Sequence, residues 1–356
     1  DPVDTKLVAK MHKAITIIQL KLEGQLIERH PEWGMGKRDI FRMVDFDRGT
    51  VTIDGSEYEL LDKNFPTVCR KDPLSLTDAE NELMSVLENS FMHSERLNSH
   101  IRFLYSKGSM YKTINGNLLF HGCIPLDENG QLQSVNIAGT DYSGKALLDK
   151  LDEIANKAYF MQPGAEKDYA ADYMWYLWSG ARSPLYGKDK MAFFERYFLD
   201  DKKLHKENYN AYYHFSEQAE VCGWILEMFG LDPERGHIIN GHVPVKIKNG
   251  EKPVKAGGKL FVIDGGISKA YQKATGIAGY TLIYDSHSLN LAEHKPFVAG
   301  ESEHTPEIHL VERLERRANI SDTDKGAELL EQINDLRELL RAYRSGEIKE
   351  SGRRVN

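Results

Sequence analysis

Cysteine is scarce in this chain of 356 residues, and its few thiols are far apart in the sequence. Cys69, Cys123 and Cys222 are odd in number and share no short spacing. A disulfide framework needs paired cysteines, usually within a small secreted domain. The sequence therefore predicts reduced thiols and argues against the class of disulfide-stabilised extracellular proteins.

Long apolar runs are also missing. No stretch approaches the ~18 uninterrupted apolar residues that a membrane-spanning helix needs. The N-terminus lacks the succession of basic, apolar and small residues that marks a signal peptide. These absences predict a cytoplasmic protein with no membrane partner.

The chain has no surplus of positive charge. Lys and Arg number 46 against 54 Asp and Glu, which gives a formal net charge of −8. Nucleic acids and anionic membranes bind to basic surfaces, because binding releases their counterions. Neither partner is expected, whereas local basic residues leave an anionic small substrate open.

What is present is an ordinary globular composition, with 41% hydrophobic and 28% charged residues. At roughly 100 to 200 residues per domain, the length allows two domains, or one domain with extensions. Changes of pattern predict a helical segment with a β-hairpin (1–105), a central part (106–297) and a charged helical extension (298–356). Helical spacing starts almost at once and the first residue is Asp1, so we expect a piece of a longer protein.

Several helices are predicted from spacing and capping residues. Apolar residues recur at helical intervals over 7–27, and this helix should stop near Gly34. Thr77 is a good N-cap with Glu80 at the capping-box position, which predicts a helix that runs to about Arg102. Helical periodicity then dominates residues 143–229.

Strands are predicted from turn residues and short apolar runs. Asp54-Gly55 and Asn115-Gly116 each predict a two-residue hairpin turn, within 50–60 and 111–120. Three further short runs of strand type lie at 237–239, 259–263 and 280–284. The charged segments 307–317 and 325–344 pair Glu with Arg or Lys at three or four residues, which is typical of solvated helices.

Two histidines share one sequence setting. His121 and His242 each follow an apolar run, stand next to a glycine, and precede a proline. Loops at strand ends are where α/β proteins place ligands and metals. A single histidine in this setting is more often structural or solvent-facing, but two in the same setting favour a ligand role.

Five segments carry a resemblance to a known family. They are Lys107-Gly-Ser-Met-Tyr111, Asn115-Gly-Asn-Leu-Leu-Phe-His-Gly-Cys-Ile-Pro125, Ser183-Pro-Leu-Tyr-Gly-Lys-Asp-Lys-Met191, His237-Ile-Ile-Asn-Gly-His-Val-Pro-Val-Lys246 and Ile263-Asp-Gly-Gly-Ile-Ser-Lys-Ala-Tyr-Gln-Lys273. With these segments the chain resembles the C-terminal two-thirds of class III fructose-1,6-bisphosphatases, over nearly its whole length. That family belongs to the calcineurin-like metallophosphoesterases. The resemblance implies an α/β (α+β) fold, the C-terminal half of a β-sandwich flanked by helices, with helical insertions and a helical C-terminal extension.

The resemblance also implies a site and an activity. His121 matches the family's isolated histidine ligand and His242 that of its Gly-His motif, both for one divalent ion of a manganese pair. Neutral imidazole suits such an ion, and a metal pair activates water while it screens phosphoryl oxygens. The implied reaction is removal of the 1-phosphate of fructose 1,6-bisphosphate, in gluconeogenesis.

The superfamily's earlier motifs are absent from this sequence. They supply the bridging carboxylate, the ligands of the other metal and the usual acid. Asp47-Arg-Gly49 lacks the preceding Gly-Asp, and Asp285-Ser-His287 comes after His242 instead of leading the order, so we interpret the two as a turn and a strand end. The catalytic acid is therefore unassigned, and we expect this chain alone to be inactive without a preceding part of the same protein.

A bisphosphate needs cations, and five basic residues near the motifs are candidates. Lysine binds phosphate as a point charge and arginine as a bidentate donor. The predicted substrate-binding residues are Arg182, Lys188, Lys190, Lys269 and Lys273. The competing interpretation is that these are solvated surface residues. The aromatic-rich run 169–178 has helical spacing, which favours core packing over a sugar platform.

Three alternatives stay open at this stage. A protein phosphatase or a dinucleotide polyphosphate hydrolase of the same superfamily would share the two histidine motifs. The segments at 183–191 and 263–273 favour the sugar phosphatase over both. The third alternative is a non-catalytic portion that folds and forms a homo-oligomer without assembling two metals.

Overall fold

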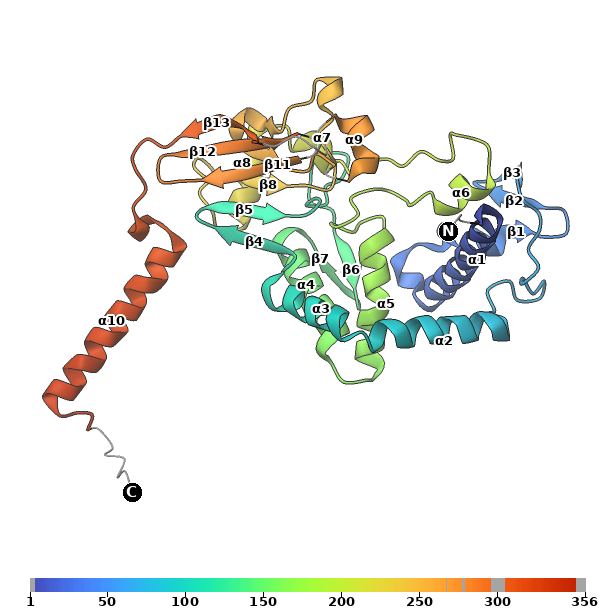
Figure 1. The fold of residues 1–356 in the computed structure, drawn as a ribbon, viewed down its shortest axis with the longest axis horizontal. Helices are drawn as coiled ribbons and strands as arrows, with labels where there is room; N and C mark the ends of the chain where they lie inside the picture. The colour runs from blue at the N-terminus through green and yellow to red at the C-terminus, as the bar shows by residue number, and fades with distance from the viewer. Residues whose placement is uncertain (1–3, 267, 277–278, 296–304, 350–356) are drawn as a thin grey trace. The chain divides into compact units, whose positions relative to one another are not determined.

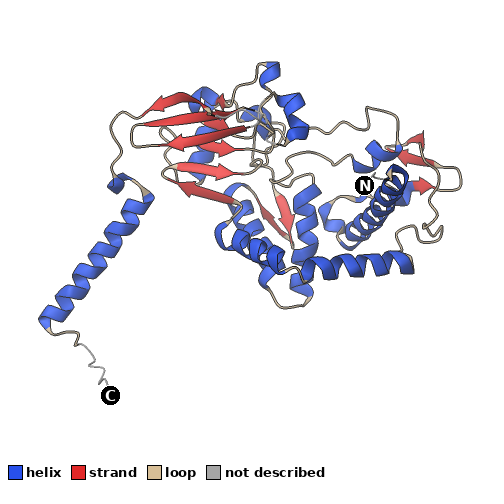
Figure 2. Ribbon diagram, in the orientation of Figure 1, coloured by secondary structure: helices blue, strands red, loops and turns tan. Residues whose placement is uncertain are grey.

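The computed structural model describes residues 4–266, 268–276, 279–295 and 305–349. Helices and strands are mixed along the chain, so the predicted α+β class is confirmed (Figure 2). Two compact units divide the chain: unit 1 is Asp1–Met110 with Gly122–Phe215, and unit 2 is Tyr111–His121 with Ser216–Asn356. The boundaries predicted near residues 105 and 298 were drawn from sequence patterns, whereas these two units are defined by contacts between residues, so those boundaries stay a prediction. No described helix has the length and apolarity to cross a membrane.

The first helix of unit 1, α1, runs over Thr5–Arg29 (dark blue in Figure 1). The Asp4 carboxylate caps it by accepting hydrogen bonds from the backbone N–H groups of Lys6 and Leu7. The predicted helix is confirmed, but it ends before Gly34. Pro31 opens a separate 3₁₀ turn there, and the residue before a proline is disfavoured in helical conformation.

A three-stranded antiparallel sheet follows, formed by β1 (Val44–Asp45), β2 (Thr50–Ile53) and β3 (Ser56–Glu59). The predicted hairpin is confirmed, and both turn residues have positive φ, 47° at Asp54 and 81° at Gly55. The Asp47-Arg-Gly49 segment is the turn between β1 and β2.

Two helices replace the single one predicted up to Arg102. The capping box of Thr77 and Glu80 starts α2 (Asp78–Met92), as predicted. The expectation of one continuous helix is wrong, because α2 ends at Met92 and α3 (Glu95–Lys107) begins after a new N-cap. The Ser94 hydroxyl accepts a hydrogen bond from the backbone N–H of Leu97, and this bond competes with continuation of the helix.

The remainder of unit 1 is mainly helical. Its elements are β6 (Val135–Ile137), β7 (Thr140–Tyr142), α4 (Gly144–Phe160), α5 (Ala165–Ser179), α6 (Phe193–Phe198) and α7 (Tyr212–Phe215). In the aromatic-rich α5, Tyr173 and Tyr176 are buried in the core cluster that α4 and α5 share. The core-packing interpretation is therefore confirmed for these two tyrosines, whereas Trp178 at the end of the run is 51% exposed.

Unit 2 contains a five-stranded mixed sheet in the order β4-β5-β8-β10-β9. The strands are β4 (Tyr111–Ile114), β5 (Asn117–Phe120), β8 (Ile238–Asn240), β9 (Val254–Lys255) and β10 (Leu260–Val262). The three central strands β5, β8 and β10 are parallel, and the outer two are antiparallel to their neighbours. The segments after the central strands therefore leave the sheet at one edge. Helix α8 (Ala219–Met228) precedes β8 in the chain.

A second, antiparallel sheet of unit 2 contains β11 (Gly279–Tyr284), β12 (Ser288–His294) and β13 (Glu307–Arg313). The helix predicted over 307–317 is wrong, since most of this segment is β13. Charged residues spaced three or four apart indicate a segment exposed to solvent, and an exposed edge strand meets this condition as well as a helix does. Pairing with β12 determines that the backbone of this segment is a strand. Asp285-Ser-His287 is the turn between β11 and β12.

Two helices complete unit 2. Short α9 spans Lys269–Thr275, and α10 spans Asp324–Ser345 (red in Figure 1). The helix predicted over 325–344 is confirmed. It ends at Gly346, whose φ of 81° is the left-handed cap that glycine provides without a steric penalty.

Candidate functional site

The two motif histidines meet at the edge of the five-stranded sheet. His121 directly follows β5 and His242 lies two residues beyond β8, and the parallel register of these strands pairs Leu119 with Ile239. His121 Nε2 and His242 Nδ1 are 3.0 Å apart, within hydrogen-bonding distance. The sheet register thus unites two residues that are far apart in the sequence.

The backbone at His242 is strained. Its φ is 64°, in the left-handed region that a side chain with a Cβ disfavours. The backbone N–H of Val243 donates to the carbonyl of Gly241 at 2.7 Å, which closes a three-residue turn about the histidine. The N–H of Gly241 donates to the carbonyl of His121 at 2.9 Å and ties both loops together. Strain of this kind costs ~1–3 kcal/mol and is concentrated at functional sites.

Burial favours the neutral form of His121 by lowering its pKa. Desolvation lowers the pKa of His121, and the carboxylate of Asp264 opposes this effect without cancelling it. A neutral imidazole offers the lone pair that a metal ligand needs. The 3.0 Å bond to His242 needs one ring nitrogen to donate and the other to accept.

Asp264 was not predicted as a site residue. It follows β10, the third parallel strand, so it leaves the sheet at the same edge as His121 and His242. Its Oδ1 accepts a hydrogen bond from the backbone N–H of Gly266 at 2.8 Å. A signal was present in the sequence, since the run 259–263 was predicted as a strand and Asp264 comes directly after it.

The histidine pair fits part of a metal site. Neutral imidazole nitrogens suit a divalent ion such as manganese. The separation of 3.0 Å between His121 Nε2 and His242 Nδ1 shows that both rings reach the same point at the sheet edge. In the part of the chain that the structure describes, however, no group of three or more His, Cys, Asp or Glu residues could hold a metal ion.

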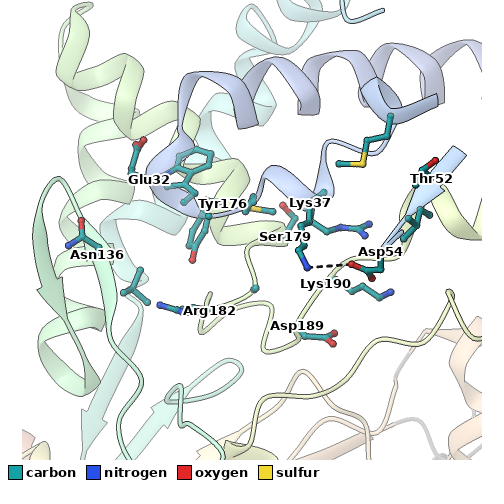
Figure 3. A pocket seen from close by; sticks show the side chains of 18 of the residues that line it. Glu32, Lys37, Thr52, Asp54, Asn136, Tyr176, Ser179, Arg182, Asp189 and Lys190 are labelled. Atoms are coloured by element: carbon teal, nitrogen blue, oxygen red, sulfur yellow. Dashed lines mark hydrogen bonds and ion pairs between the residues drawn. The ribbon is translucent and has the colours of Figure 1, made fainter. Parts of the chain in front are cut away.

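Two of the predicted substrate cations line a cavity of about 860 Å³ in unit 1 (Figure 3). Arg182 and Lys190 lie there with Lys37 and Arg38, which sequence reasoning missed. Both missed residues belong to the 3₁₀ turn Gly36–Arg38 just after α1, and no motif marks them. The acidic lining residues are Glu32, Asp54 and Asp189.

The cavity cations differ in how far they are already paired. The Arg38 guanidinium donates to both carboxylate oxygens of buried Glu195, at 2.7 and 3.0 Å. Lys190 Nζ is 3.9 Å from the same carboxylate. Lys37 and Asp54 form an exposed pair at 3.4 Å (dashed line in Figure 3), which contributes little. The Arg182 guanidinium donates a hydrogen bond to the carbonyl of Ser134 at 3.2 Å, and no carboxylate of the described residues forms an ion pair with it, so its charge is available to a ligand.

The other three predicted cations do not line this cavity. Lys188 forms an ion pair with Glu207 at 2.8 Å and lies over the rings of Tyr186 and Tyr209. Lys273 belongs to unit 2, in α9, where its backbone carbonyl accepts a hydrogen bond from Lys248 Nζ at 2.6 Å. Lys269 is the first residue of α9, and its side chain lies outside the described part of the structure.

The fold and the histidine pair define a class: an α+β protein with candidate metal ligands where neighbouring parallel strands end. A family model described as "Firmicute fructose-1,6-bisphosphatase" matches residues 1–345. The chain belongs to this family.

Curated relatives carry one name, "Fructose-1,6-bisphosphatase class 3". The protein of Clostridium botulinum (strain Alaska E43) is 52% identical over 354 residues, which cover 98% of this chain and 54% of the relative. The protein of Bacteroides fragilis (strain YCH46) is 52% identical over 352 residues, 97% of this chain and 53% of the relative. The chain thus spans about half the length of the curated relatives it matches. No solved structure matches it.

Proposed function

We propose that the protein to which this chain belongs hydrolyses the 1-phosphate of fructose 1,6-bisphosphate in gluconeogenesis, as a cytoplasmic metallophosphoesterase. The observation that carries the proposal is the 3.0 Å approach of His121 Nε2 to His242 Nδ1 at the sheet edge, in a member of this family. The free thiols of Cys69, Cys123 and Cys222 support a reducing compartment.

In this proposal His121 and His242 hold one manganese ion of a pair. Bound there, the metal pair would lower the pKa of a water and screen the phosphoryl oxygens. The parallel pairing of β5 with β8 brings the loops of the two histidines together, and Asp264 places negative charge beside His121. Two imidazoles do not complete a site for manganese, so further ligands must come from outside this pair, and this chain alone should bind the ion weakly.

We assign Arg182 and Lys190 to binding a phosphate group of the substrate. The cavity that they line also holds the carboxylates of Asp54 and Asp189, which would accept hydrogen bonds from sugar hydroxyls. Lys188 is a weaker candidate because Glu207 already pairs with it. Lys269 and Lys273 stay predictions for the same role.

Replacing each histidine tests the metal assignment. In the whole protein, His121→Ala and His242→Ala should each lower the turnover of fructose 1,6-bisphosphate by ~100-fold or more, because lost electrostatic stabilisation of the transferring phosphoryl group has that magnitude. Circular dichroism should show an unchanged fold. The control is His287→Ala, in the turn between β11 and β12, which should change turnover little.

Near-normal turnover of either histidine variant with manganese present would reject the ligand assignment. Two tight manganese sites in a calorimetric titration of this chain by itself would reject the need for outside ligands. If the whole protein cleaves a phosphopeptide or a dinucleotide polyphosphate faster than the sugar bisphosphate, the proposed substrate is wrong.

Replacing the cavity cations tests the substrate assignment. Arg182→Ala and Lys190→Ala should raise the KM for fructose 1,6-bisphosphate by ~10-fold, the worth of one charge-assisted hydrogen bond. Hydrolysis of a generic aryl phosphate should change little, because it lacks the second phosphate. Lys63→Ala is the control, because Lys63 pairs with Glu59 on the surface of unit 1 and does not line the cavity. Equal loss with both substrates would contradict a role at the remote phosphate.

A further inference from the structure

Helix α10 carries an apolar stripe with the spacing of a coiled coil. Leu329, Ile333, Leu336, Leu340 and Tyr343 alternate at four and three residues, which is the a and d pattern of a heptad repeat. Leu330 and Leu339 widen the stripe on its two sides. Each of these side chains is exposed, with fractions between 39% and 63%.

The described part of the chain leaves this stripe uncovered. Apart from the turn that follows the helix, where the backbone N–H of Ile348 donates to the carbonyl of Ala342 at 3.3 Å, α10 bonds to the rest of unit 2 at its first turn, where Asn115 and Asp324 exchange hydrogen bonds at 2.8 and 3.1 Å. Gly326 is the buried residue of the helix. Seven large apolar side chains on one face of an exposed helix mark an interaction surface. They contribute hydrophobic stabilisation only when a partner removes them from water.

The charges of α10 are divided between its halves. The N-terminal half has four acidic residues and one lysine: Asp324, Lys325, Glu328, Glu331 and Asp335. The C-terminal half has three arginines and one glutamate: Arg337, Glu338, Arg341 and Arg344. A second α10 that lies antiparallel would place the basic half against the acidic half at both ends, whereas a parallel one would oppose like charges.

We propose that α10 is a self-association helix that pairs antiparallel with α10 of a second copy of this chain. In the register that keeps the apolar stripe continuous, Ile333 packs against Leu336 of the second copy and Leu329 against Leu340. An a position then always faces a d position. The contact is isologous, since the same surface serves both copies, and it closes as a two-fold dimer. The charge division favours a second copy of this chain as the partner, because the charges of α10 are complementary to those of an antiparallel α10.

Sedimentation of the purified chain tests the pairing. The chain should show a concentration-dependent equilibrium between monomer and dimer. Ile333→Asp should weaken dimerisation by ~30-fold or more, because it places a charge in the centre of an apolar contact. Asn334→Asp is the matched control: it creates the same side chain one residue away, off the stripe, and should change the dissociation constant by less than about twofold.

A chain that stays monomeric at every concentration overturns the proposal, and the stripe would then belong to a different partner. Equal effects of Ile333→Asp and Asn334→Asp would also overturn it. Neither result depends on phosphatase activity, so failure here is distinct from failure of the proposed function.

Cysteine cross-linking tests the orientation. In a Cys69→Ser background, which removes the exposed thiol, a mixture of Leu329→Cys and Leu340→Cys chains should form a mixed disulfide on oxidation. Leu340→Cys alone should not cross-link, because antiparallel pairing offsets its two copies by eleven residues, ~16 Å, beyond the ~7 Å limit between Cα atoms. Rapid cross-linking of Leu340→Cys alone would show parallel pairing and overturn the antiparallel register.

Discussion

Arg38 lines the charged cavity of unit 1, and the substitution Arg38→Met should destabilise this unit. Arg38 is the main partner of Glu195, whose side chain has no exposed surface, and it also donates to the carbonyl of Met191 at 2.8 Å. Breaking a buried ion pair from one side costs ~3–5 kcal/mol. Lys190 Nζ, 3.9 Å from the same carboxylate, offsets part of this cost. We therefore expect a loss of about 3 kcal/mol, a large share of the ~5–15 kcal/mol that holds a domain folded.

Urea denaturation followed by circular dichroism measures this loss. With a slope of ~2 kcal/mol/M, the midpoint should fall by about 1–2 M. Arg48→Met is the matched control, because Arg48 pairs with Glu57 on the surface, where 65% and 46% of the two side chains are exposed, and such a pair contributes ~1 kcal/mol or less. Adding Glu195→Leu to Arg38→Met should restore much of the stability. Equal midpoints for Arg38→Met and Arg48→Met would refute the reasoning.

Two other predictions concern histidines of unit 2. Burial lowers the pKa of His237, although Glu312 beside it acts in the opposite direction. Below its ordinary pKa of ~6.5, this histidine therefore binds a proton more readily in the unfolded chain than in the folded one. Its contribution to folding stability is present above pH ~6.5 and is lost as the pH falls below that value. His237→Gln should flatten the pH dependence of the urea midpoint between pH 7 and 5, and an unchanged slope would contradict this. At His242, whose φ is 64°, the variant His242→Gly should be ~1 kcal/mol more stable than His242→Ala. Both substitutions remove the imidazole, but only glycine relieves the backbone strain. Equal urea midpoints would show that the backbone there is unstrained.

Local chemistry predicted the turns and caps of this fold well. The Asp54-Gly55 hairpin and the capping box at Thr77 each depend on a few adjacent residues, and both are present. The errors came where a neighbouring element decides the outcome. Charge spacing over 307–317 could not reveal that β12 would pair with this segment, and periodicity could not show that Ser94 would start a new helix.

In the candidate site, too, the local signals were visible in the sequence and the effects of neighbouring elements were not. The settings of His121 and His242 were visible in the sequence, and the structure brings the two imidazoles together at the ends of neighbouring strands. Their meeting required the parallel pairing of β5 with β8, which sequence spacing does not encode. Lys37 and Arg38 were missed for a similar reason, since they reach the cavity of unit 1 from a turn without any motif.

The histidine pair depends on the sheet for its arrangement. Leu118 and Ile238, the paired residues that precede the two loops, are fully buried, so the register that sets the imidazole distance is held by apolar contacts. Such contacts form on folding, and they offset the strain that the backbone of His242 carries. If the pair holds an ion, as proposed, the hydrogen bond between His121 Nε2 and His242 Nδ1 must first be given up, so that both nitrogens present a lone pair. Its affinity would then be set by how many further ligands join the pair, and within the described residues no third His, Cys, Asp or Glu completes such a group.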